Sequence, residues 1–307
     1  MSPHARPILK WAGGKRQLLP ELRRYYPVRF GRYFEPFLGS GAVFLDLHNS
    51  GALDGKVAIL SDINADVIGC YRAVRDDVDG VVGELRTLET AYRGKGAAFF
   101  YHVRDRRFNP ARQRLGLGAQ RAAAYDVALA AMLIFLNRAG FNGLFRVNSR
   151  GDFNVPAGDH PRPTICREQD LRLWSAALTR PGLRLEVAGF DAALSAAGAD
   201  DFIYLDPPYA PTSPTARFTA YTAGGFGEAE QRRLQQVVLD LASRGAHLLV
   251  SNSAVPQVRG LYATHDEARA AGLRATTVAA RRAINSHPAR RGPVREYLIS
   301  NVARRTV

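Results

Sequence analysis

The sequence predicts an α/β fold built on a mostly parallel sheet, interrupted by a mostly helical insertion. Short apolar runs, each followed by a glycine or an aspartate and then by a helical pattern, occur in residues 1–68 and again after residue 166. Residues 69–166 show helical periods instead of this alternation. Because helical crossovers join parallel strands, the alternation is typical of an open α/β sheet, whose ligands bind beyond the carboxyl ends of its strands.

The charge and composition narrow the possible partners. With 307 residues the chain can form one large domain or two, and 42 Lys and Arg against 28 Asp and Glu give a net charge of +14. Such an excess is expected of a nucleic-acid binder, and it is mostly arginine, which suits phosphate and guanine. A GC-rich genome would explain the preference for arginine but not the net sign. Two cysteines and no apolar run of about 18 residues lead us to expect a cytoplasmic, DNA-associated protein without a metal or a membrane partner.

The N-terminal segment Pro7–Leu19 contains an apolar stretch, a glycine pair and the start of a helix. Gly13-Gly14-Lys15 superficially matches a phosphate-binding loop, but the preceding glycine and the following Ser or Thr of such a loop are absent. Trp11 is either a core aromatic or a platform for a flat ligand, with Lys15 close enough to bind a carboxylate.

Residues Tyr33–Gly41 predict a strand and a glycine turn, followed by a helix. This geometry brings a ligand close to bare backbone at a helix N-terminus. Phe44 replaces the third glycine of the dinucleotide fingerprint, which argues against NAD. A second strand, Val57–Leu60, leads to Asp62, 23 positions after Gly39. An acidic residue there can bind ribose hydroxyls or cap a helix.

The insertion is predicted to be helical and basic. Helical periods cover four segments, Asp66–Val74, Val78–Leu88, Ala97–Arg106 and Ala119–Asn137. Residues 137–156 then alternate like a β-hairpin and combine arginines, asparagines and phenylalanines. Such a hairpin can present side chains to base edges and a ring to a base step, although a surface hairpin would also explain its glycines and asparagines.

The α/β alternation returns with a strand at Leu183–Ala188, and then with the strand Phe202–Leu205. The second of these strands ends in Asp206-Pro207-Pro208-Tyr209. Two prolines cannot continue a strand, so the turn presents acceptors and a ring to one pocket, which suits a planar substrate with an amino group. An ordinary Pro-Pro turn at a strand end is the alternative.

The last third of the chain completes the sheet. Residues Ala210–Phe226, rich in Pro, Thr, Ser and Gly, are expected to form a substrate lid. A helix, three strands and a basic, phosphate-contacting loop are expected in this order: helix Glu228–Arg244, strand Ala246–Ser251, strand Arg274–Ala283, loop Asn285–Pro293 and strand Val294–Val302.

These segments together resemble one family. The chain is similar to the DNA adenine methylase (Dam) branch, of D12 class, of adenine-N6 methyltransferases in the order of four motifs: Lys10–Lys15, Glu35–Gly41, Asp62–Asn64 and Asp206–Tyr209. Further segments extend the resemblance over nearly the whole chain: Asn142–Leu144, Asn154–Pro156, Phe218–Tyr221 and Ser251-Asn252. The resemblance implies a Rossmann-like S-adenosylmethionine-dependent methyltransferase fold, formed by residues 1–68 and 167–307, with a target-recognition insertion at 69–166.

The resemblance also implies an activity and residue roles. Methyl transfer from S-adenosylmethionine to adenine N6 in double-stranded DNA, within GATC, would follow flipping of the base out of the duplex. The implied catalytic residues are Asp206, Pro207, Pro208 and Tyr209. The implied cofactor residues are Trp11, Lys15, Glu35, Phe37, Gly39, Gly41, Asp62 and Asp206, with Phe190 and Asp191 as a weaker match. The DNA contacts expected in the insertion are Arg104, Arg138, Phe141, Asn142, Leu144, Arg146 and Pro156, with Phe141 where the family often has Tyr.

Other functions were weighed against this one. Relatives of Asp-Pro-Pro-Tyr also serve N4-cytosine and protein-glutamine methylation, and a DNA-binding module without chemistry is a further alternative. The leading aspartate and the positive charge favour DNA, and the hairpin favours adenine. Every proposed site position holds a competent residue, which favours an active enzyme, and we expect it to act as a monomer. Ser253 departs from a His sometimes found in the family and receives no role.

Overall fold

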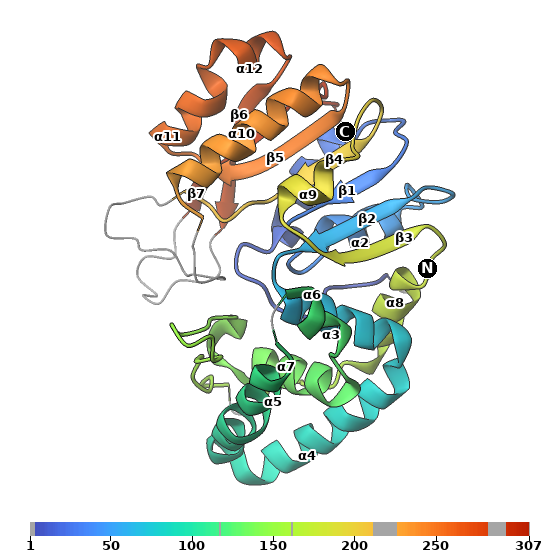
Figure 1. The fold of residues 1–307 in the computed structure, drawn as a ribbon, viewed down its shortest axis with the longest axis vertical. Coiled ribbons are helices and arrows are strands. Elements are labelled where there is room, and N and C mark those ends of the chain that lie inside the picture. The colour runs from blue at the N-terminus through green and yellow to red at the C-terminus, as the bar shows by residue number, and fades with distance from the viewer. Residues whose placement is uncertain (1–3, 117, 161, 211–225, 282–292, 307) are drawn as a thin grey trace.

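The computed structural model of the protein describes residues 4–116, 118–160, 162–210, 226–281 and 293–306 (Figure 1). At its centre lies a seven-stranded sheet with the order β3-β2-β1-β4-β5-β7-β6. The strands are β1 (Tyr33–Glu35), β2 (Ala58–Asp62), β3 (Leu183–Val187), β4 (Phe202–Leu205), β5 (His247–Ser253), β6 (Arg274–Arg281) and β7 (Pro293–Ser300). The α/β class and the mostly parallel sheet expected from the sequence are confirmed.

The sheet winds outward in two directions from its middle. The neighbours from β3 to β5 are parallel, whereas β7 runs antiparallel between β5 and β6. Tyr33 of β1 lies beside Ala58 of β2 on one side and Phe202 of β4 on the other. The boundary between β1 and β4 is therefore the topological switch point, where open α/β sheets bind their ligands beyond the carboxyl ends of the strands.

Helices cover both faces of the sheet (Figure 1). The α-helices are α1 (Leu19–Leu22), α2 (Ala42–Asn49), α3 (Ala65–Asp76), α4 (Val78–His102), α5 (Asn109–Arg114), α6 (Gly118–Ala123), α7 (Val127–Ala139), α8 (Glu168–Leu178), α9 (Phe190–Leu194), α10 (Glu228–Ser243), α11 (Pro256–Val258) and α12 (Asp266–Ala270). Shorter 3₁₀ turns are η1 (Lys15–Gln17), η2 (Arg23–Tyr25) and η4 (Phe141–Gly143), and π-helical turns are η3 (Val103–Phe108) and η5 (Arg259–Ala263).

Two hydrophobic cores follow from the alternation of side chains along the strands. On β4, Phe202 and Tyr204 point into the larger core, whereas Ile203 and Leu205 point into the smaller one. Helices α9, α10 and the η5 turn close the smaller core. The larger core continues from the sheet into α4 and α7, so the helical insertion shares its hydrophobic interior with the sheet. The insertion gathers at the end of the molecule opposite α12 (Figure 1).

The helices of the insertion agree with those expected in one place and differ in another. Val78–Leu88 and Ala97–Arg106 were expected as separate helices, and the span of α4 is indeed interrupted by the non-helical Gly96, where φ is +55°. After His102 the chain continues as η3. In contrast, the single helix expected over Ala119–Asn137 is divided into α6 and α7. Asp126 begins α7 because its side chain accepts a hydrogen bond from the backbone N–H of Leu129.

The regular β-hairpin expected over residues 137–156 is not formed. The structure has only two isolated bridges there, Gly140 with Ala157 and Val147 with Phe153. Between them, the chain turns through η4, where Asn142 and Gly143 have φ of +53° and +64°. Asparagine and glycine adopt this left-handed conformation with least strain, so they replace ladder pairing with a tight turn.

Some expectations fall on other parts of the chain. The lid over Ala210–Phe226 and the basic loop Asn285–Pro293 lie almost wholly outside the described residues, as do Phe218 and Tyr221. Across the described ranges, we find no helix with both the length and the apolar character needed to cross a membrane.

Candidate active site

Asp206 and Lys15 form the centre of the candidate site. Asp206 follows β4 directly, beside the end of β1, so it lies at the switch point of the sheet. The Lys15 ammonium lies 2.8 Å from Asp206 Oδ1, and the two side chains are only 4% and 19% exposed. The same ammonium donates to the carbonyl of Gly13 at 2.5 Å. The N-terminal segment and the strand β4 therefore meet through a largely buried ion pair.

Opposing effects determine the pKa of the Asp206 carboxyl. Burial raises its pKa to about 6, the positive charge of Lys15 lowers it, and the nearby Glu296 carboxylate raises it. An aspartate with this pKa is mostly ionised at neutral pH, and a modest environmental change alters its charge.

The glycine turn after β1 brings backbone and ring into contact. Gly39 and Gly41 have φ of +45° and +63°, and a Cβ on Gly39 would come within 2.7 Å of the Trp11 ring. Glu35 at the end of β1 is buried and accepts from the hydroxyl of Tyr33 and from the backbone N–H of Phe44. Glu35 therefore caps the first turn of α2. Because its side chain is buried, the pKa of Glu35 is raised to about 8.

Asp62 holds this glycine turn from the next strand. Its carboxylate accepts from the N–H of Gly39 at 2.9 Å and from the N–H of Asn64 at 2.8 Å. Burial raises its pKa to about 6, while these two backbone donors lower it. The following Ile63 is 58% exposed, an unusual state for a large apolar side chain at a strand end.

Aromatic rings line the remaining walls. Phe37 stacks on Phe190 with ring centroids 5.7 Å apart, and Phe226 meets Phe37 edge-on. Trp11 stacks on Phe145 of the insertion, also at 5.7 Å. Aromatic pairs therefore occur both on the sheet side of the candidate site and between the N-terminal segment and the insertion.

Comparison with known proteins identifies the family of this chain. The sequence model of the D12 class N6 adenine-specific DNA methyltransferases matches residues 11–278. The chain belongs to this family.

Named relatives are of two kinds. Two Type II methyltransferases, M1.LlaDCHI of Lactococcus lactis subsp. cremoris and M.MjaIII of Methanocaldococcus jannaschii, are 35% and 36% identical to the chain over 257 residues. These alignments cover 84% and 81% of the chain and 84% of each relative. The DNA adenine methylase of Haemophilus influenzae is 32% identical over 294 residues, covering 95% of the chain and 92% of the relative. The expected family and Rossmann-like methyltransferase fold are thereby confirmed.

The crevice of this adenine-specific DNA methyltransferase fits the methyl donor that its family implies, S-adenosylmethionine. A carboxylate at the end of β2, Asp62, has lone pairs suited to ribose hydroxyls, and the exposed Ile63 beside it offers an apolar surface to a base. Gly39 and Gly41 are buried at the start of α2, where a Cβ would collide with Trp11 or Trp174. Polar and apolar groups thus meet beside this turn.

The N-terminal segment is held by the insertion. Asn137 Oδ1 accepts from the N–H of Lys10 at 2.7 Å, and Asn137 Nδ2 donates back to the Lys10 carbonyl at 2.9 Å. Arg138, expected to contact DNA, is 8% exposed and donates to the Ile8 carbonyl at 2.7 Å. Its geometry supports an internal role, because the guanidinium faces backbone and not solvent. The role of Asn137 was missed from the sequence, which placed this residue at the end of a helix and the start of the hairpin-like segment without assigning it a contact.

The other residues expected to bind DNA differ in their solvent exposure. Arg146 and Pro156 are exposed, whereas Phe141, Asn142 and Leu144 are half-buried. Arg146 is braced by Asn154, whose side-chain oxygen accepts from Arg146 Nε at 2.8 Å. Asn142 Nδ2 is buried and has no hydrogen-bond partner among the described residues, so a donor remains available there.

The remaining basic residues lie on the η3 turn. Arg104 is mostly buried, paired with Asp105 at 2.7 Å and donating to the Val155 carbonyl. The adjacent Arg106 and Arg107 are exposed. These two are better placed than Arg104 to bind phosphate.

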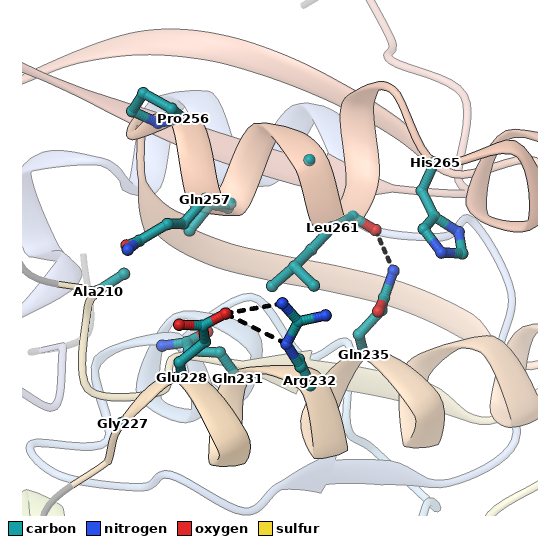
Figure 2. Close-up of a pocket in the computed structure, with 12 residues that line it drawn as sticks. Ala210, Gly227, Glu228, Gln231, Arg232, Gln235, Pro256, Gln257, Leu261 and His265 are labelled. Atoms are coloured by element: carbon teal, nitrogen blue, oxygen red, sulfur yellow. Dashed lines mark hydrogen bonds and ion pairs between the residues drawn. The ribbon is translucent and has the colours of Figure 1, made fainter.

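Partners of the Asp206–Tyr209 motif were also missed. Gln231 of α10 donates to the Pro208 carbonyl at 3.0 Å and accepts from Asn252 of β5 at 2.9 Å. Ser253, left without a role by its sequence, donates to the Ala210 carbonyl at 2.9 Å. Behind this loop, Gln231 lines a cavity of about 430 Å³ between α10 and the segment from Pro256 to His265 (Figure 2).

Proposed function

We propose that the protein transfers a methyl group from S-adenosylmethionine to the N6 nitrogen of adenine in double-stranded DNA, within GATC, after flipping the base out of the duplex. The observation that carries the proposal is the position of Asp206, at the switch point and paired with the buried Lys15. Family membership supplies the adenine and the DNA.

Asp206 and Pro207 orient the reacting amine. The ionised Asp206 carboxylate accepts one N6 hydrogen, and the Pro207 carbonyl accepts the other. The nitrogen lone pair then faces the methyl group. As the new carbon–nitrogen bond forms, the bond from the methyl carbon to the sulfonium sulfur would break, leaving the thioether S-adenosylhomocysteine, and one N6 proton is lost to water. Lys15 favours the ionised form of Asp206. Orientation and desolvated electrostatics supply most of the acceleration, without a covalent protein intermediate.

The methyl donor occupies the crevice between the glycine turn and the aromatic walls. S-adenosylmethionine supplies an activated methyl group on a sulfonium. Asp62 binds its ribose, Trp11 and Lys15 contact its amino-acid part, and Phe37 lines the pocket. Glu35, Gly39 and Gly41 act through shape, because they fix the start of α2 beside the crevice.

The insertion, residues 69–166, recognises the target. Stacking of a flipped base on Tyr209 offsets part of the few kcal/mol needed to extrude it. Phe141 fills the space left in the duplex, and Asn142, Leu144 and Pro156 contact the neighbouring bases. Arg146 reads a guanine, since its guanidinium matches the O6 and N7 acceptors in the major groove.

The proposed target, GATC, rests on the resemblance to the Dam branch. The chain is about equally identical to Type II methyltransferases and to a DNA adenine methylase, so similarity alone does not select the site. The segment that carries this resemblance is Arg138–Asn154, at its DNA-facing positions. A monomer would suffice, since one chain contains both the crevice and the recognition segment.

Methylation of plasmid DNA in vitro, followed by single-molecule sequencing, tests the proposal. We expect N6-methyladenine only in GATC, and only with S-adenosylmethionine. Replacement of Arg146 by Ala should cost about 1–3 kcal/mol and relax discrimination at one base pair. The exposed Arg269 of α12 provides a control, Arg269→Ala, that should leave the context unchanged. Methyladenine in another shared context would reject GATC and retain the chemistry.

A further inference from the structure

The loop that carries the reacting groups is held along its length by side chains from other elements. Lys15 pairs with Asp206, Gln231 binds the Pro208 carbonyl, and Ser253 binds the Ala210 carbonyl. One partner of this loop comes from the antiparallel end of the sheet. The Tyr209 hydroxyl donates to Glu296 Oε2 at 2.7 Å.

Glu296 is an unusual residue for its place. It lies within β7, opposite Ser253 of β5 and Val278 of β6, and is only 9% exposed. A carboxylate is rarely buried in a strand without a partner that offsets the lost hydration. Tyr209 provides that partner, and a hydrogen bond to a charged acceptor is stronger than one between neutral groups.

The contact holds the outer end of the Tyr209 ring. A tyrosine ring has two side-chain rotations, and the bond from its hydroxyl to Glu296 restricts rotation about Cα–Cβ. The hydroxyl lies on the Cβ–Cγ axis, so the plane of the ring is restricted by what lies against its face. The Lys15 ammonium lies 4.7 Å from the centre of the same ring. The ring is therefore held between Lys15, which pairs with Asp206, and Glu296.

We propose that Glu296 is a positioning residue for methyl transfer, holding the Tyr209 ring in the orientation that stacks on the target base. The proposal rests on the proposed function, in which Tyr209 contacts that base. Glu296 acts through Tyr209 and through its negative charge near Asp206, and it touches no reacting atom.

The charge of Glu296 gives the proposal a second, independent signature. Asp206 is influenced by the cation Lys15 and by the anion Glu296, and it interacts electrostatically with Glu35, Tyr204 and Tyr209. Because Glu296 raises the pKa of Asp206, removing its charge lowers that pKa. The acid limb of the pH profile, where the methyl-transfer rate falls because Asp206 becomes protonated, then moves to lower pH.

The experiment compares variants in single-turnover methyl transfer to a duplex with one target adenine. Glu296→Ala and Tyr209→Phe should each slow the reaction on the order of tenfold to a hundredfold, the effect of one hydrogen bond to a charged group. Glu296→Gln keeps an acceptor oxygen and should retain most of the rate. The double variant Glu296→Ala/Tyr209→Phe should be no slower than the slower single variant, because both remove one contact.

Two further measurements separate positioning from general damage. S-adenosylmethionine affinity, measured by calorimetry, should stay within about twofold of the starting protein for Glu296→Gln and Tyr209→Phe. The fluorescence of 2-aminopurine at the target position should report altered stacking in Glu296→Ala and in Tyr209→Phe. The exposed Glu267 of α12 provides the matched control Glu267→Ala, which should change none of these quantities.

The outcomes distinguish this proposal from the one on which it rests. If the unaltered protein methylates no adenine in DNA, the proposed function fails. If it methylates adenine and Tyr209→Phe retains full rate, the positioning role is wrong, even when Glu296→Ala does not fold. Multiplicative losses in the double variant would likewise overturn it. An acid limb that moves to lower pH in Glu296→Gln, but not in Tyr209→Phe, supports it.

Discussion

At the residue scale, Asp206 carries the strongest prediction. Asp206→Ala should reduce methyl transfer by about 10²-fold or more, because a preorganised acceptor is lost. DNA binding should remain nearly unchanged, since the carboxylate contributes no favourable contact to phosphate. The isosteric Asp206→Asn tests the charge alone and should also be strongly impaired. Transfer of labelled methyl groups and fluorescence anisotropy measure the two effects, and retained turnover in both variants would refute the role.

Glu35 gives a prediction about pH and stability. Its folded pKa is raised from 4.5 to about 8, mainly by burial, so the folded protein favours the protonated form. This stabilisation is full below the ordinary pKa and is lost as pH rises through about 8. Glu35→Gln has no proton to lose and retains an acceptor for Tyr33 and Phe44. Its melting temperature should therefore fall less than that of the starting protein between pH 5 and pH 8.5. Equal slopes of melting temperature against pH in the two proteins would contradict the raised pKa of Glu35.

The motifs made the residues of the crevice predictable, but not their partners. Asp206, Asp62 and the two glycines stand at strand ends, and the order of apolar runs and turns places such positions at one edge of a sheet. Glu296 is different, because it lies in the middle of a strand and meets Tyr209 across 87 residues of sequence. Nothing in the local pattern of β7 identifies which side chain covers a buried carboxylate.

At the scale of elements, the ion pair between α3 and α5 determines how the insertion is attached. Arg112 makes a two-pronged contact with Asp66, through Nε at 2.8 Å and Nη2 at 2.7 Å, and both side chains are 3% exposed. Arg112 also donates to the Gly151 carbonyl of the recognition segment. Asp66 has a second, longer ion pair with Arg121, at 3.5 Å. Arg112→Met should therefore destabilise the protein by less than the roughly 3–5 kcal/mol of a fully unpaired buried charge, because Asp66 keeps this weaker partner.

The double variant Asp66→Asn/Arg112→Met supplies the control for this pair. It removes both charges and should recover part of the lost stability, as measured by urea unfolding. Losses that add in the double variant would show that the two side chains act independently.

The η3 turn gives a prediction about salt. Arg106 and Arg107 are exposed, and each phosphate contact contributes about −0.9 to the log–log slope of affinity against salt. Replacing both by Ala should make the slope less negative by about 1.8. The control Arg269→Ala, on α12, should keep the slope. Arg290 and Arg291, which the sequence also favours as phosphate contacts, lie outside the described residues.

Element boundaries were less predictable than element types in the insertion. Two helices were expected on either side of Gly96, and this residue does interrupt the helical backbone, but the first helix continues to Lys95, beyond its expected end at Leu88. The alternating residues 137–156 were expected to pair as strands. Apart from two isolated bridges, they form no ladder. Their side chains contact Lys10, Ile8 and Trp11, and the local sequence pattern does not predict these contacts.

At the scale of the whole molecule, the division of the chain into domains stays a prediction. The proposed boundaries near residues 68 and 166 separate the sheet from the helices in sequence. In space, however, one hydrophobic core runs from β1 and β4 through α3 into α4 and α7. We therefore expect cooperative unfolding of the two parts.

The contacts between the insertion and the N-terminal segment limit how recognition of the DNA target can change during evolution. A Cβ on Gly143 would come within 2.3 Å of the Lys10 side chain, and Phe145 stacks on Trp11, so the η4 turn cannot be remodelled without moving the crevice wall. Arg146 and Pro156 are exposed and make no such contact in the described structure. New specificities should therefore arise first at these two positions, while the turn beside them is inherited nearly unchanged.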